Sequence, residues 1–86
     1  MHEMSIALEV RRIVEDNIAA DRLADVVSVS LEVGDDAGVE CDSLQLSLDV
    51  VLASPPFAHA KAEILRVPGD VLRVSQVEIR DGSAND

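Results

Sequence analysis

The chain has 86 residues, enough for one small domain, and 48% of them are hydrophobic, a mixture typical of a globular protein. Seventeen acidic residues against seven basic ones give a net charge of −10, which opposes a phosphate backbone. The chain also lacks Tyr and Trp, the usual platforms for stacking bases. We therefore expect no nucleic-acid partner.

A single cysteine, Cys41, cannot form an internal disulfide, and no CxxC pair is present. Neither an oxidising compartment nor a structural zinc site is indicated. Charged residues interrupt the first twenty positions, and no apolar run approaches the ~20 residues of a membrane span. These features predict a cytoplasmic protein with no membrane contact.

Residues 4–18 place their apolar side chains on one broad arc at helical spacing, which predicts an amphipathic helix. The arc comprises Met4, Ile6, Ala7, Leu8, Val10, Ile13, Val14 and Ile18. Arg11 interrupts it, and we expect its stem to lie on the core while the guanidinium reaches water or an acidic partner.

Residues 25–34 alternate apolar and polar side chains and end at Gly34, which predicts a strand that is central or well paired. Its apolar set is Val27, Val29, Leu31 and Val33. The next segment is acidic and rich in turn formers, and it predicts a loop. Its carboxylates could bind a hard cation, but the alternating ligands of an EF-hand are missing, so we interpret them as solvated. They are Asp35, Asp36, Glu40 and Asp42.

Residues 44–53 fit two periodicities. Leu44, Leu46, Leu48 and Val50 alternate as in a strand, whereas Leu44, Leu48, Val51 and Leu52 form a helical stripe. A cap at Asp42 or Ser43 and a stop at Pro55-Pro56 favour the helix.

Residues 62–67 and 71–79 predict two strands joined through Pro68, Gly69 and Asp70. The second strand changes phase along its length, and a β-bulge near Ser75 or Gln76 would turn both of its apolar pairs to the core. Proline followed by glycine suits a tight hairpin poorly, so we expect a wider three-residue loop with Gly69 in the left-handed region.

The order helix, strand, helix, strand, strand (αβαββ) predicts an α+β fold. In it, two helices cover one face of a three-stranded mixed sheet. We expect a single domain over residues 1–80 and a polar tail over residues 81–86.

The chain begins with histidine in second position. The free amine of Met1, the backbone nitrogens of His2 and Glu3, and the His2 imidazole lie within a few bonds of one another. Ni(II) and Cu(II) favour such nitrogen-rich, planar sets. The alternative is that these residues are only the polar start of a helix.

Several motifs, in order and spacing from Met1 to about Arg80, resemble the HypA/HybF family of nickel metallochaperones. They are MHEMSIALEV, IVED, VSLEVG, AGVE, AEILRVPG and LRVSQVEI. The resemblance implies that His2 is a nickel ligand, with the Met1 amine and Glu3 beside it. It also implies delivery of Ni(II) for maturation of [NiFe]-hydrogenase, and in some bacteria of urease. The implied partners are the nickel-loading GTPase and the hydrogenase large-subunit precursor.

Members of that family usually carry a zinc-binding insertion with paired CxxC motifs between the strands ending in VPG and beginning in LRV. Only Pro68, Gly69 and Asp70 stand there in this chain, so we expect no zinc domain and no zinc. The chain then represents a natural lineage that lost the insertion or an engineered deletion. A second hypothesis is a protein-interaction or structural module that no longer transfers metal.

Other residues carry weaker signals. Cys41 stands at the expected start of the second helix, where a thiol can become reactive, but no second ligand accompanies it and we expect it to be passive. His59 is expected to be an exposed loop histidine. No phosphate-binding loop and no Ser/His/Asp arrangement is present, so no enzymatic activity is expected. The sequence leaves open whether the chain forms a homo-oligomer.

Overall fold

The first helix, α1 (Glu3–Asn17), forms where apolar side chains recur at helical spacing. The computed structural model describes residues 2–80, so the expected tail at 81–86 lies outside the described residues. The helix buries Ile6, Ala7, Val10 and Val14. Met4 and Leu8, which we expected on the apolar arc, are 43% and 49% exposed. The buried stripe is narrower than predicted because only one side of α1 meets the rest of the protein.

The second helix, α2 (Cys41–Leu52), confirms the helical interpretation of the ambiguous segment. It buries the helix-spaced set Leu44, Leu48, Val51 and Leu52. Leu46 and Val50, which the strand pattern would have turned inward, point outward. The cap is Glu40, whose side chain accepts a hydrogen bond of 3.3 Å from the backbone N–H of Ser43. The prediction of a cap at Asp42 or Ser43 was wrong, because both residues lie inside the first turn.

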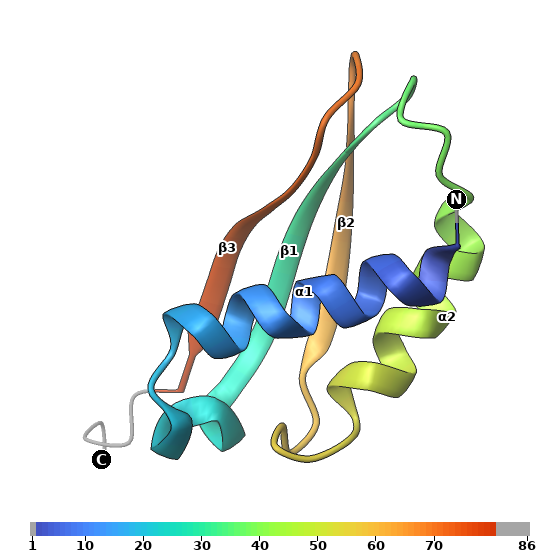
Figure 1. Cartoon of the computed structure of the whole chain (residues 1–86). Helices are drawn as coiled ribbons and strands as arrows, with labels where there is room; N and C mark the ends of the chain where they lie inside the picture. Colours follow the sequence, from blue (N-terminus) through green and yellow to red (C-terminus); the bar gives the residue numbers. More distant parts are fainter. Residues whose placement is uncertain (1, 81–86) are drawn as a thin grey trace.

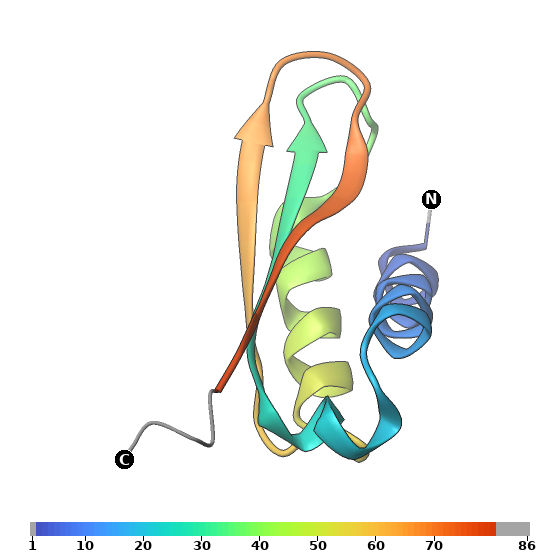
Figure 2. The same ribbon diagram turned by 90° about the vertical axis from the view of Figure 1, so that its left-hand side faces the viewer.

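Three strands form one mixed sheet in the order β2–β1–β3 (Figure 1). The central strand β1 (Val26–Gly34) runs parallel to β2 (Lys61–Val67) and antiparallel to β3 (Leu72–Ile79). Both helices lie on the same side of this sheet (Figure 2). The predicted α+β class, element order and central position of the strand are confirmed. A short 3-10 helix over Ala20–Asp25, between α1 and β1, was not predicted.

Two register shifts between β1 and β3 adjust which side chains face the core. At the first, Ser30 pairs with Gln76 and Leu31 with Val74, which leaves Ser75 as the extra residue and confirms the predicted bulge. At the second, Val26 pairs with Ile79 and Ser28 with Glu78, leaving Val27 extra on β1. Val27 is therefore 38% exposed and Val26 is buried instead, so the prediction that Val27 belongs to the apolar set of β1 was wrong.

The segment between β2 and β3 does not make a hairpin, because the two strands lie on opposite sides of β1. It crosses the end of β1, where the N–H of Gly34 donates to the Val71 carbonyl at 2.6 Å and the N–H of Asp35 donates to the Val67 carbonyl at 2.8 Å. Gly69 has a φ of 88°, which confirms its left-handed conformation. Within residues 2–80, none of the helices is both long and apolar enough to span a membrane.

The helices contribute unequally to the layer above the sheet. α2 packs along β2, whereas α1 packs mainly on α2 and stands farther from the strands (Figure 2). A shared core nonetheless joins the two layers, and its fully buried large side chains are Val14, Val29, Leu31, Val33, Leu44, Leu48 and Leu52. The amino-terminal residues of α1 are thereby held beside the start of α2.

Candidate functional site

His2 lies immediately before α1. Of the expected nickel-binding residues Met1, His2 and Glu3, the structure describes the last two, and His2 is the one that lies outside the helix. It is exposed, and its backbone is extended, with φ −83° and ψ 117°. Its carbonyl accepts from the N–H of Ile6 at 3.3 Å, but its side chain makes no capping hydrogen bond. The imidazole is therefore not used to start the helix. Met1, whose amine completes the expected site, lies outside the described residues.

Glu3 is the first residue of α1. The first four N–H groups of a helix have no acceptor within that helix, so the amide of Glu3 is not engaged in the helical ladder. Its carboxylate stands where the helix dipole favours negative charge. The expected site requires the amide nitrogen of Glu3. Because this nitrogen lies at the amino-terminal end of α1, a metal could bind it without breaking a hydrogen bond of the helix.

The Glu3 carboxylate is also tied to the second helix. Its Oε2 accepts a hydrogen bond of 3.2 Å from the backbone N–H of Glu40, and this bond, with one from the N–H of Glu3 itself, lowers the pKa of Glu3 below its ordinary value. Glu40 in turn caps α2 through Ser43. The starts of the two helices are therefore linked: the Glu3 carboxylate accepts from the Glu40 N–H, and the Glu40 carboxylate accepts from the Ser43 N–H. The sequence carried no signal for this contact, because its partners are distant in the chain.

The remaining titratable residues do not gather around this terminus. Cys41 is the first residue of α2 and is half-buried against the core, and His59 is exposed in the loop before β2. Asp35 pairs with Arg66 at 2.9 Å. Among residues 2–80, no three His, Cys, Asp or Glu side chains lie close enough to hold a metal ion together.

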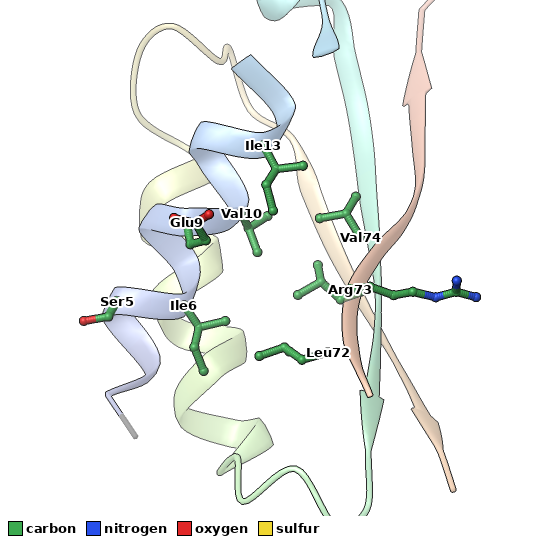
Figure 3. Close-up of a pocket in the computed structure, with 9 residues that line it drawn as sticks. Ser5, Ile6, Glu9, Val10, Ile13, Leu72, Arg73 and Val74 are labelled. Atoms are coloured by element: carbon green, nitrogen blue, oxygen red, sulfur yellow. The ribbon is translucent and has the colours of Figure 1, made fainter. Parts of the chain in front are cut away.

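A groove of about 240 Å³ lies beside the terminus, between α1 and β3 (Figure 3). Its apolar lining includes Ile6, Val10, Ile13, Leu31, Leu72 and Val74. The charged residues at its rim are engaged elsewhere: Glu9 bonds with Arg12, and Arg73 points away from the groove (Figure 3) toward Glu32 at 2.8 Å. The groove exists because α1 stands away from β3, and it gathers no set of convergent polar groups such as a small-molecule site uses.

Comparison with known proteins gives one consistent match. The family profile described as hydrogenase/urease nickel incorporation, metallochaperone, HypA, matches residues 1–82. Proteins named hydrogenase maturation factor HypA are similar to this chain. The one from Cereibacter sphaeroides is 42% identical over 84% of this chain and 64% of its own length. The one from Paracoccus denitrificans is 37% identical over 94% of this chain and 74% of its own length. The one from Azoarcus sp. strain BH72 is 44% identical over 80% of this chain and 60% of its own length. The chain thus spans about two thirds of the length of these relatives.

Proposed function

The chain belongs to the HypA family of hydrogenase/urease nickel-incorporation metallochaperones, and from that premise we propose that it binds Ni(II) at its amino terminus and delivers it for maturation of [NiFe]-hydrogenase. The ligands are the Met1 amine, the backbone nitrogens of His2 and Glu3, and the His2 imidazole. Urease is the other target that the family description permits. The proposed receivers are the nickel-loading GTPase of hydrogenase maturation and the hydrogenase large-subunit precursor.

The observation that carries the proposal is the placement of His2 and Glu3. The His2 imidazole is exposed and caps nothing, and the Glu3 amide lies in the helix turn whose N–H groups lack helical acceptors. Ni(II) can therefore take these nitrogens without unwinding α1. A planar set of four nitrogens suits Ni(II), and it forms from one tripeptide without help from distant residues.

In this proposal the protein is a carrier and not an enzyme. No zinc takes part, because the short segment from Pro68 to Asp70 replaces the cysteine-bearing insertion that the resemblance leads us to expect. The competing function is a protein-interaction module that keeps the fold without transferring metal, and the lack of the cysteine-bearing insertion between the last two strands favours it. The two functions differ in whether nickel moves to an acceptor.

The deciding experiment compares native chain, His2→Ala and His59→Ala. Ni(II) is titrated into each at neutral pH and the absorption of planar nickel is followed. The His2→Ala chain should lose this absorption and the His59→Ala chain should keep it, because His59 lies in an exposed loop far along the sequence. Transfer is then measured by mixing the loaded chain with the GTPase or the precursor and locating the metal after separation. Retention of nickel by the native chain in the presence of both acceptors would favour the interaction module.

A further inference from the structure

The outer face of α2 exposes large apolar side chains. Leu46 and Val50 are 69% and 60% exposed, more than the other large hydrophobic residues that the structure describes. With the exposed Ala53 at the end of the helix, they recur at positions i, i+4 and i+7. This spacing is how a helix presents anchors to a hydrophobic groove on another protein.

The neighbouring helix also exposes large apolar side chains. Met4 and Leu8 of α1 are also spaced at i and i+4 and are about half exposed. α1 packs on α2, and both lie on the same side of the sheet. Single exposed hydrophobic residues are ordinary on a protein surface, whereas several on adjoining elements mark an interaction surface.

The charged residues of α2 itself have one sign, although His59 and Lys61 lie near Asp49. α2 carries Asp42 and Asp49 and no Lys or Arg, and Glu40 precedes it. Neither aspartate takes part in a salt bridge within residues 2–80, where the acidic residues that do are Glu9, Asp16, Glu15, Asp25, Glu32 and Asp35. A complementary surface would therefore be apolar at its centre and basic at its edge. A second copy, itself carrying a net charge of −10, does not meet this description.

We propose that the outer face of α2 is a docking surface, which inserts Leu46, Val50 and Ala53 into an apolar groove rimmed by Lys and Arg on a protein partner. The choice of partners to be tested rests on the proposed function, but the surface itself is inferred without reference to nickel. The start of the same helix lies beside Glu3, and the anchors follow farther along α2, toward its carboxyl end.

The test measures binding of the native chain to the purified nickel-loading GTPase and to the purified large-subunit precursor from the same organism by isothermal calorimetry. The double variant Leu46→Ser/Val50→Ser should bind at least one of them tenfold or more weakly. The matched control is Leu65→Ser, which removes an apolar side chain of 51% exposure from β2 and should bind as the native chain does. Circular dichroism checks that all three chains remain folded.

A second pair of variants tests the charge. Asp42→Lys/Asp49→Lys should weaken binding at low salt, and added salt should reduce the difference, whereas Glu63→Lys on β2 should have little effect. The proposal is overturned if the double apolar variant binds both proteins as tightly as native chain, if Leu65→Ser loses as much affinity, or if the folded native chain binds neither protein. It is also overturned if sedimentation shows that Leu46 and Val50 hold two copies of this chain together.

Nickel titration of the same samples separates this proposal from the proposed function. The α2 variants should bind Ni(II) as the native chain does, since none of the substituted residues lies at the terminus. Normal docking without nickel binding would reject the metallochaperone and leave the surface standing. If the double variant binds nickel normally and still docks as tightly as the native chain, the docking surface is rejected and the metallochaperone proposal stands.

Discussion

The Glu3 carboxylate accepts a hydrogen bond of 3.2 Å from the backbone N–H of Glu40, which joins the starts of two helices that are 37 residues apart in the chain. The contact satisfies an N–H that precedes α2 and fixes the carboxylate next to the proposed nickel site. A structural change at the amino terminus can therefore alter the start of α2. The pH at which the Glu3 carboxylate titrates reports whether the hydrogen bond from Glu40 is formed.

We predict that the contact is lost in acid. Because the Glu40 N–H lowers the pKa of Glu3 below 4.5, the folded chain holds this proton less tightly than the unfolded chain. The contact therefore adds stability above pH 4.5, and this contribution disappears as the pH falls through the lower folded pKa. The Glu40 amide proton shift, followed by NMR, should show an inflection below pH 4.5 that Glu3→Gln removes. An inflection at or above that pH would contradict the contact.

A second prediction concerns two leucines on α2. Leu48 is fully buried and Leu46 is 69% exposed, although both belong to the same alternating series. Leu48→Ala should lower the free energy of unfolding by ~2–5 kcal/mol, whereas Leu46→Ala should change it by less than ~0.5 kcal/mol. Chemical denaturation of both variants measures the difference. Equal effects would mean that the helix is rotated about its axis from its position here.

Much of this fold follows from local patterns. The helix spacing of Leu44, Leu48, Val51 and Leu52 outweighed the strand alternation because Pro55 and Pro56 follow at the right distance to end a helix. The phase change along β3 predicted the bulge at Ser75, since no regular strand could bury both Val74 and Val77. These signals lie within one element and are visible without knowing its neighbours.

The parts that could not be predicted depend on pairing between elements. The bulge at Val27 arises from its register with Ile79 and Glu78, far along the chain. The separation of β2 and β3 by β1 is likewise set by the sheet order. At the candidate site, His2 and Glu3 could be singled out from the sequence, but the bond from Glu40 could not, because a backbone donor leaves no mark in the sequence.

A third prediction follows from the close approach at the end of β1. A Cβ on Gly34 would collide with the Gly69 carbonyl and the Val71 nitrogen. Gly34→Ala should therefore displace the segment between β2 and β3 and cost about 3 kcal/mol. Gly69→Ala has open space but a φ of 88°, and it should cost only about 1 kcal/mol. Thermal unfolding measures the stability of the two variants. A larger loss for Gly69→Ala than for Gly34→Ala would mean that the segment between β2 and β3 does not pass close to Gly34.

The fourth prediction is that folding does not require zinc. The core is built from aliphatic side chains of both layers together with Phe57, and Cys41 is the only cysteine. Treatment with a chelator should leave the thermal transition unchanged, and elemental analysis of the treated, folded protein should find no zinc. One tightly held zinc per chain whose removal unfolds the domain would refute the prediction.

The last prediction concerns the free amine of Met1. If this nitrogen is a ligand, acetylating it or leaving a few residues in front of it should abolish planar nickel absorption while α1 remains folded. The reason is that the planar set consists of the Met1 amine, the backbone nitrogens of His2 and Glu3, and the His2 imidazole. Blocking the amine removes one of these four ligands.

The same ligands must lose protons when they bind, so nickel affinity of the native chain should rise with pH. Cys41→Ser serves as the matched control, because Cys41 lies beside Glu40 but outside the proposed ligand set, and it should keep both the spectrum and the pH dependence. If acetylated or extended chains bind nickel as tightly as the native terminus, the amine is not a ligand. The opening residues would then be interpreted as a relic of the family or as a surface on which a partner docks.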